Sequence, residues 1–396
     1  MIKKHVFINL TLLIMFTHLH SQTAIVLDIT IPITPLTQGY VIESINGRGF
    51  SQCTGNHISN ISSSNPASIS DYKRPSFGIS YQRESVVNPA IWNDIKHQRN
   101  QKNIPQSIGF LLPINQYVLG FGFSQRYDSK HTFGPFEIFT FDDPDGTGEY
   151  LSISKEESVN SYSGMVSYSF ENFLKDNNTM NLGIQVHYNT LRINSHGFSS
   201  GMKVKASNFG WTAGARYNLS DKTQIGAYYE RIPKFKNGEV EFDGITLTPL
   251  ENPEDSTMAF IYEDVSISGE IPDRFHVGIS NRIFKSTIIT LDLTNVYWKQ
   301  LSSTSKNFVD VSGGIIQKIG DQLSLSLSFL STGRHFNNEN YFQSELNKNL
   351  KGFFLLGGVN LKIHSLDIDL AYAASAFNTG DWRKQKLGKI SLGYAF

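Results

Sequence analysis

Cysteine is almost absent from this chain of 396 residues, because Cys53 is the only one. A single cysteine excludes an internal disulfide and any metal site built from several thiolates. Beyond its N-terminal region the sequence has no apolar run of about 18 residues, the length that a membrane-spanning helix needs. Charge of one sign is not in excess either, since 35 basic and 35 acidic residues cancel. This balance argues against a nucleic-acid partner and against binding to an anionic surface.

Two common enzyme signatures are also missing, because the sequence contains no His-Glu-x-x-His motif and no P-loop. We therefore predict a protein that is not an enzyme and that uses no cofactor. One enzymatic alternative stays open at the outer rim, where His131, His335 and loop carboxylates could form a protease site. A barrel phospholipase would need a serine and a histidine on lipid-facing positions, whereas the strand histidines are predicted to face inward.

The N-terminus carries the pattern of a secretory signal peptide. Lys3 and Lys4 precede a short apolar core at residues 6–16, and Ser21 is a small residue before an expected cleavage site. We predict that residues 1–21 are removed on export. Export without a spanning helix leaves a soluble exported protein or an outer-membrane barrel.

The final stretch of the chain reads QKLGKISLGYAF and alternates strictly. Ile390, Leu392, Tyr394 and Phe396 fall on one side, and small or polar residues fall on the other. Because successive strand side chains point to opposite faces, this is a predicted strand with one apolar face. A terminal Phe on a soluble edge strand would fray and favour aggregation. In an outer-membrane barrel the same residue belongs to the aromatic girdle at the lipid interface.

Similar alternation recurs from residue 76 onward, and the connectors between the segments are short and long in turn. The segments are 76–83, 106–113, 116–127, 161–170, 179–194, 204–217, 223–231, 272–283, 287–298, 307–319, 322–331, 351–363, 365–376 and the terminal strand. Short turns at one end and long loops at the other are typical of outer-membrane proteins. The predicted fold is an all-β, membrane-spanning, antiparallel up-and-down β-barrel of about 14 strands over residues 76–396. A propeller would show blade repeats, and none appear.

Residues 22–75 differ from the rest, because most of this stretch is rich in Gly, Ser and Asn and has no period. Such a segment cannot form a core by itself. A barrel of about 14 strands is wider than one filled by its own side chains. We predict that residues 22–75 form a hatch in the lumen, with a disordered lead-in as the alternative.

Three short motifs accompany this architecture: Asn65-Pro66-Ala67, IPDRFHVGIS at residues 271–280 and LDLTNVYWKQL at residues 291–301. With the exported 14-strand pattern, they resemble the FadL/TodX-type family of outer-membrane long-chain fatty-acid and hydrocarbon transporters. The resemblance implies that the hatch, with Asn65, Pro66 and Ala67, plugs the barrel. It also implies that a hydrophobic ligand enters from outside and leaves sideways at a kink in the third strand. Compared with that family, the hatch is longer in this sequence, and the fourth outer loop is more elaborate.

The alternation of inward-facing and outward-facing side chains along each strand, here called the strand phase, gives candidate site residues inside the barrel. A buried acyl carboxylate needs a cationic partner, and the candidates for ligand binding are Arg126, His276, Arg216 and Arg282. The alternative is an internal ion network with lumen carboxylates, namely Glu230, Asp292, Asp367 and Asp369.

Two further groups of residues invite a functional interpretation. Gly120 and Gly122 lie on the lumen face of the third strand, where glycine marks a bend or a close backbone approach. We interpret them as the lateral gate, with room for hatch packing as the alternative. A loop groups four carboxylates around glycines, which suits calcium, although their spacing is not that of an EF-hand. These are Asp142, Asp143, Asp145 and Glu149, and because a solvated hairpin tip explains them better than a calcium site we predict no metal.

The predicted function is an outer-membrane channel for uptake of hydrophobic or amphipathic small molecules. Its expected partners are the outer-membrane bilayer, a hydrophobic ligand and the outer-membrane assembly machinery, and the expected state is a monomer. A general porin is disfavoured, because a hatch would block flow. The alternatives are a shuttle in protein secretion and the rim enzyme described above.

Overall fold

The computed structural model describes most of the predicted barrel and part of the segment before it. The described residues are 27–32, 45–51, 53–55, 57–88, 98–137, 148, 150–173, 178–197, 200–243, 265–300, 307–331, 353–375 and 384–396. The predicted signal peptide at residues 1–21 lies outside them. So do the carboxylates of the suggested calcium loop, Asp142, Asp143, Asp145 and Glu149.

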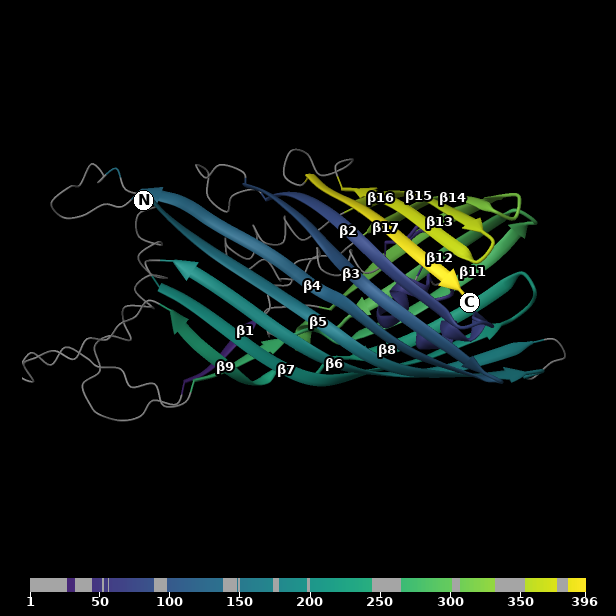
Figure 1. Ribbon diagram of the computed structural model, residues 1–396, viewed down its shortest axis with the longest axis horizontal. Helices are drawn as coiled ribbons and strands as arrows, with labels where there is room; N and C mark the ends of the chain where they lie inside the picture. Colours follow the sequence, from purple (N-terminus) through teal and green to yellow (C-terminus); the bar gives the residue numbers. More distant parts are fainter. Residues whose placement is uncertain are drawn as a thin grey trace, which may run out of the picture.

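The described chain is almost entirely strand, with three short 3-10 helices (Figure 1). The strands are β1 (Leu27–Pro32), β2 (Ser76–Asn88), β3 (Gln98–Ile114), β4 (Tyr117–Glu137), β5 (Tyr150–Glu171), β6 (Thr179–Gly197), β7 (Ser200–Asn218), β8 (Thr223–Arg231), β9 (Lys236–Asp243), β10 (Val265–Glu270), β11 (Arg274–Phe284), β12 (Thr287–Val296), β13 (Phe308–Ile319), β14 (Leu323–Ser331), β15 (Phe353–Ile363), β16 (Leu366–Ala374) and β17 (Lys384–Ala395). The helices are η1 (Ile58–Ser63), η2 (Pro66–Asp71) and η3 (Trp298–Gln300).

Fourteen of these strands close into one antiparallel barrel, which confirms the predicted fold. The order runs from β2 to β8 and from β11 to β17, with β8 paired to β11. The pairing of β17 with β2 closes the ring, and the N–H of Phe396 donates to the carbonyl oxygen of Pro75 at 2.9 Å. β9 extends the wall by pairing with the outer part of β7. The short turns and the end of β17 lie at one end, here called the turn end, and the opposite end is the loop end (Figure 1).

Several strands are longer than predicted. β3 already begins at Gln98, and β4 and β5 run on through residues 128–137 and 150–160, where the alternation suggested long loops. The reason is visible on the outward face of β5, where Ser154, Glu156 and Ser158 replace apolar residues. A strand that continues beyond the lipid has no reason to keep one apolar face, so its sequence no longer alternates.

The two faces of the barrel wall have opposite polarity. Leu327 on β14 is 65% exposed on the outside, whereas its neighbour Ser328 is 3% exposed and points into the lumen. The terminal strand shows the same contrast between exposed Ile390 and buried Lys389. A wall that exposes apolar side chains and buries polar ones is suited to a lipid surround. Within the described residues, no helix combines the length and the apolar character needed to cross a membrane.

The stretch predicted as a hatch divides into two parts. β1 pairs in parallel with β10, so residues 27–32 belong to a separate two-stranded sheet. The described residues of 45–75, called the lumen segment below, carry η1 and η2 and lie within the barrel toward its turn end (Figure 1).

Candidate functional site

The lumen segment is bound to the barrel wall on several sides. Lys389 of β17 donates to the side-chain oxygen of Asn60 at 2.8 Å, and Ser326 of β14 donates to the carbonyl of Gly47 at 2.9 Å. On another side, the guanidinium of Arg216 on β7 holds the carboxylate of Asp71 at the end of η2. The segment is therefore fixed by polar contacts that come from well-separated strands.

Close packing of this segment depends on glycines of the wall. A Cβ atom added to Gly109 would lie 2.2 Å from the carbonyl oxygen of Ile58, and one added to Gly183 would lie 2.4 Å from the carbonyl carbon of Pro66. Any larger residue would push the segment away from the wall. Comparable clashes with the lumen segment occur at Gly78, Gly122, Gly214, Gly226, Gly278, Gly358 and Gly393.

The Asn65-Pro66-Ala67 tripeptide is one of these docking points. Asn65 caps η2, because its side-chain oxygen accepts a hydrogen bond from the N–H of Ala67 at 3.0 Å. Its amide group donates to the carbonyl of Ala215 on β7 at 3.0 Å and to that of Cys53 at 3.1 Å. Pro66 occupies the first helical position, where its missing N–H costs nothing. The tripeptide thus joins helix capping to attachment on the wall.

Two of the four predicted ligand-binding residues meet in one buried cluster. Arg126 of β4 forms an ion pair with Glu230 of β8, and it donates to the carbonyl of Ser62 at 2.7 Å. Arg274 of β11 donates to the same Glu230 carboxylate at 2.9 Å through Nε. His276 lies nearby, bonded to Thr294 at 2.8 Å. Two arginines therefore share one carboxylate.

The other two predicted ligand-binding residues lie elsewhere. Arg216 is buried and forms a bidentate pair with Asp71, so its role in the structure is to anchor the lumen segment. Arg282 is exposed at the turn end, where its backbone N–H donates to the carbonyl of Lys222 at 2.8 Å. The four residues do not form a single site.

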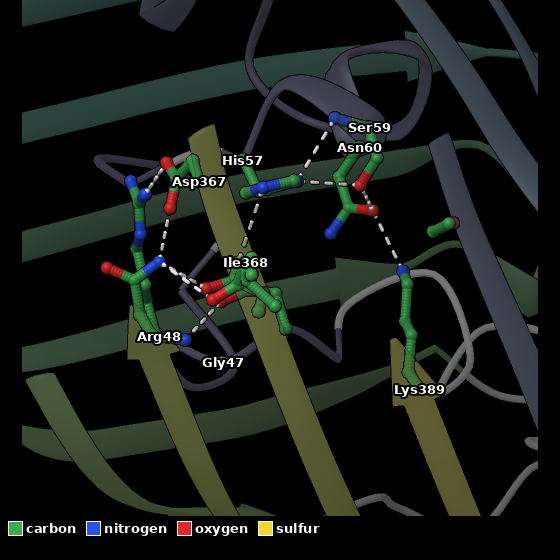
Figure 2. A network of polar contacts seen from close by, with 12 residues as sticks. Gly47, Arg48, His57, Ser59, Asn60, Asp367, Ile368 and Lys389 are labelled. Carbon is green, nitrogen blue, oxygen red and sulfur yellow. Dashed lines mark hydrogen bonds and ion pairs between the residues drawn. The ribbon is translucent and has the colours of Figure 1, made fainter. Parts of the chain in front are cut away.

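A second polar network joins the lumen segment to β15, β16 and β17 (Figure 2). Arg48 pairs with Asp367 at 2.5 Å, and Asn360 donates to Asp369 at 2.7 Å. His57 accepts from the N–H of Ser59 and lies 3.9 Å from the Asp369 carboxylate. Burial lowers the pKa of His57, and Asp369 opposes this only in part.

The wall changes its pairing where β3 meets β4. Among the described residues the β3–β4 register ends at Ser107 and Ser124, although both strands continue toward the loop end. Gln106 is an extra residue in β3 against β2, and Arg126 is an extra residue in β4 against β5. Two β-bulges thus lie beside the last common pair. Bulges bend a strand and end its regular pairing.

Gly120 and Gly122 lie within the regular part of the β3–β4 ladder. A Cβ at Gly122 would lie 2.0 Å from the Ser62 hydroxyl oxygen, so this position leaves room for the lumen segment. A Cβ at Gly120 would meet Met165 and Leu111. Their assignment as the lateral gate stays a prediction, and the irregularity itself begins beyond them at Arg126.

The lumen lining changes from polar to apolar toward the loop end. On β6, His187 and Asn189 are followed by Leu191, and on β16 Asp369 is followed by Ala371. The change occurs on both sides of the barrel. On the β5 to β8 side, the buried apolar residues beyond it are Val159, Leu191, Ile193, Val204, Ala206, Ile232 and Phe235. On the opposite side they are Leu330, Phe354, Leu356, Ala371, Ala373 and Leu387, which form one core cluster with Ile45 and Phe50 of the lumen segment.

Strand phase alone did not single out Arg274 or the wall glycines other than Gly122, although both carried a signal. Arg274 has the same inward phase as His276, two positions earlier in the strand. Within the described residues, glycines that pack against the lumen segment recur on nine barrel strands, and close backbone approach is the usual reason for glycine in a strand. Arg48 had no such signal, because the lumen segment has no periodicity.

The fold is that of known transport proteins. No protein-family model matches the chain, and no curated protein matches it in sequence. Among solved structures, the Pseudomonas putida toluene transporter TodX is 12% identical with a TM-score of 0.61, covering 90% of this chain and 99% of its own. A Pseudomonas aeruginosa FadL homologue is 13% identical with a TM-score of 0.60, covering 93% and 100%. The Ralstonia pickettii toluene transporter TbuX is 13% identical with a TM-score of 0.56, covering 90% and 99%. The resemblance to FadL/TodX-type barrels is therefore confirmed at the level of the fold.

Proposed function

We propose that the protein is an outer-membrane channel that takes up hydrophobic or amphipathic small molecules of the long-chain fatty-acid type. The observation that carries this proposal is the change of the lumen lining from polar to apolar. An apolar tail in contact with the outer lining would gain about 0.8 kcal/mol per buried CH₂. The similar toluene transporters are named for hydrophobic substrates, which agrees with such a lining.

The cluster of Arg126, Arg274 and Glu230 is the proposed site for an acidic head group. Glu230 lies at the end of β8, two residues before Ile232, and the apolar lining on this side of the barrel begins at Ile232. A carboxylate at this level would meet the guanidinium groups of Arg126 and Arg274 while its tail stays on the apolar side. Charge-assisted hydrogen bonds to arginine would fix the head group.

Release is proposed to occur sideways between β3 and β4. The ladder between them ends at Ser107 and Ser124, and the bulges at Gln106 and Arg126 turn the strands at this point. A molecule leaving here would reach lipid without passing the lumen segment. Capture by the outer loops would precede these steps and rests on the apolar residues of loops outside the described part of the chain.

A reversible cross-link tests the sideways route. In a Cys53→Ser background, Gln106→Cys with Gln125→Cys would tie β3 to β4 just beyond their last pair. Phe110→Cys with Phe121→Cys is the matched control, because these two residues are already paired. We expect oxidation of the first pair to abolish accumulation of labelled oleate, reduction to restore it, and the control pair to transport normally.

Two results would count against the proposal in different ways. Normal transport by the oxidised Gln106/Gln125 variant would rule out release between β3 and β4. If the wild-type protein does not accumulate oleate, the ligand class is wrong. The alternative of a shuttle in protein secretion would then gain weight.

A further inference from the structure

Three cations occupy equivalent positions at the turn end of the barrel. Arg282, Lys318 and Lys362 are the last lumen-side residues before short turns of β11, β13 and β15. Each is followed by an isoleucine on the lipid face, with Ile283, Ile319 and Ile363 exposed to 49%, 50% and 43%. The unit of a basic residue followed by isoleucine thus repeats on alternate strands.

The backbone holds the three cations in the same way. The N–H of Arg282 donates to the carbonyl of Lys222 at 2.8 Å, and the N–H of Lys318 to that of Ser286 at 2.7 Å. The N–H of Lys362 donates to the carbonyl of Gln322 at 2.7 Å. Each bond reaches the preceding short turn. Because neighbouring strands lie about 4.8 Å apart, cations on alternate strands are spaced by about 10 Å along an arc.

The side chains on this arc are exposed and available to a partner. Within the described residues, Arg282, Lys318 and Lys362 make no side-chain hydrogen bond or ion pair. Lys222 and Lys285 add exposed positive charge on the intervening turns, and Asp221 and Asp321 are the exposed acidic residues of these turns. The arc is therefore electropositive, although the whole chain has a net charge of zero.

The geometry points to an acidic periplasmic protein that docks on this arc, and we propose this interaction as a second property of the molecule. Anionic lipid fits less well, because the cations have lumen phase and the lipid-facing neighbours are isoleucines. A single small anion cannot span an arc of about 20 Å. A protein with an acidic face can engage all three charges and would be steered to them electrostatically. The inference rests on the proposed function only for its orientation, with the turns in the periplasm.

A defined polyanion provides the test. Full-length protein in nanodiscs of neutral lipid would be titrated with poly-L-glutamate of about 50 residues, which is long enough to span the arc of about 20 Å. We expect binding at low salt that weakens as salt rises. The variant Arg282→Glu/Lys318→Glu/Lys362→Glu should bind at least about tenfold more weakly, since attraction becomes repulsion at three sites.

The matched control reverses three exposed cations elsewhere. Lys73→Glu/Arg74→Glu/Lys299→Glu makes the same change in net charge, and its three cations lie outside the arc. We expect it to keep most of the wild-type affinity. Equal losses in both variants would show that only net charge matters and would overturn the proposal.

Three other results would also overturn it. These are no poly-L-glutamate binding by the wild type, full competition by millimolar free glutamate, and a preference for anionic lipid in the nanodisc that the arc variant loses. Oleate accumulation is measured separately. If poly-L-glutamate binds but oleate is not taken up, the docking proposal stands and the proposed transport function is wrong. If oleate is taken up but poly-L-glutamate does not bind, only the docking proposal is wrong.

Discussion

The guanidinium of Arg126 on β4 pairs across the lumen with the carboxylate of Glu230 on β8. The same side chain donates to the carbonyl of Ser62 in the lumen segment at 2.7 Å. One residue therefore connects two walls of the barrel with the segment between them. Because Arg126 is also the bulged residue of β4, this connection lies where β3 and β4 lose their common ladder.

The cluster predicts unequal costs for removing its members. Glu230→Gln leaves Arg126 and Arg274 buried without their shared carboxylate, so we expect a loss of about 3–5 kcal/mol in the free energy of unfolding. Arg126→Met leaves Glu230 balanced by Arg274, and we expect a smaller loss. Urea unfolding in lipid vesicles measures both. Equal costs would contradict the sharing of one carboxylate by two arginines.

The polarity of the wall predicts a contrast on β14. Leu327→Arg places a charge on the lipid face and should cost about 2–4 kcal/mol if the position lies near the bilayer midplane. Ser324→Arg is the control, because this residue has lumen phase and lies beside the open turn end. Ser326 is unsuitable, since its hydroxyl bonds to Gly47. Folded fractions on unboiled gels would report the difference, and similar losses at both positions would mean that the assigned faces are wrong.

The barrel itself could be predicted because its main signal is local. The alternation of Leu325 and Leu327 with Ser326 and Ser328 reports the two faces of β14 without knowledge of any partner strand. The same reasoning gave the number of barrel strands and the closing strand. It failed at the strand ends beyond the lipid, because residues such as Glu156 no longer alternate with apolar neighbours.

The site was harder to predict because its contacts join distant parts of the chain. Inward phase identified Arg126 and Arg216 as lumen cations, but phase cannot say that one pairs with Glu230 and the other with Asp71. The lumen segment lacks a period, so nothing local placed Arg48 beside Asp367. The end of the β3–β4 ladder depends on bulges against two further strands, which no single strand reveals.

Cys53 provides a native reporter of the lumen segment. Cys53 is buried, and this burial is the main cause that raises the pKa of its thiol. The nearby Asp292 carboxylate raises this pKa further. Because the thiolate is the reactive form, we expect a maleimide to label the native protein very slowly. Gly122→Val should speed this labelling, since its Cβ would lie 2.0 Å from the Ser62 hydroxyl oxygen and displace η1.

Gly164→Val is the matched control for that experiment. A Cβ at Gly164 on β5 would meet nothing within 4 Å, so this variant gains the same bulk without touching the lumen segment. We expect its labelling rate to equal that of the wild type. If Gly122→Val also labels at the wild-type rate, the packing of η1 against β4 is not as described.

His57 predicts how stability depends on pH. Its pKa is lowered, chiefly by burial, so the folded protein holds it neutral near pH 7. The charged groups around it are Asp369, Asp367, Arg48 and Lys389. In the unfolded chain a histidine takes up a proton as pH falls through about 6.5. The stabilisation is therefore complete above this pH and is lost progressively below it.

Replacing His57 should remove this dependence. Between pH 7.5 and 5.5 we expect the free energy of unfolding of the wild type to fall by up to about 1.4 kcal/mol through this one group. His57→Gln should be less stable at pH 7.5 but should lack that fall, whereas the exposed His196→Gln should keep it. Urea titrations at the two pH values, combined with the rate of Cys53 labelling, separate unfolding of the barrel from release of the lumen segment. If His57→Gln shows the same fall as the wild type, another group must account for it, and His57 would not be a neutral buried residue in the folded protein.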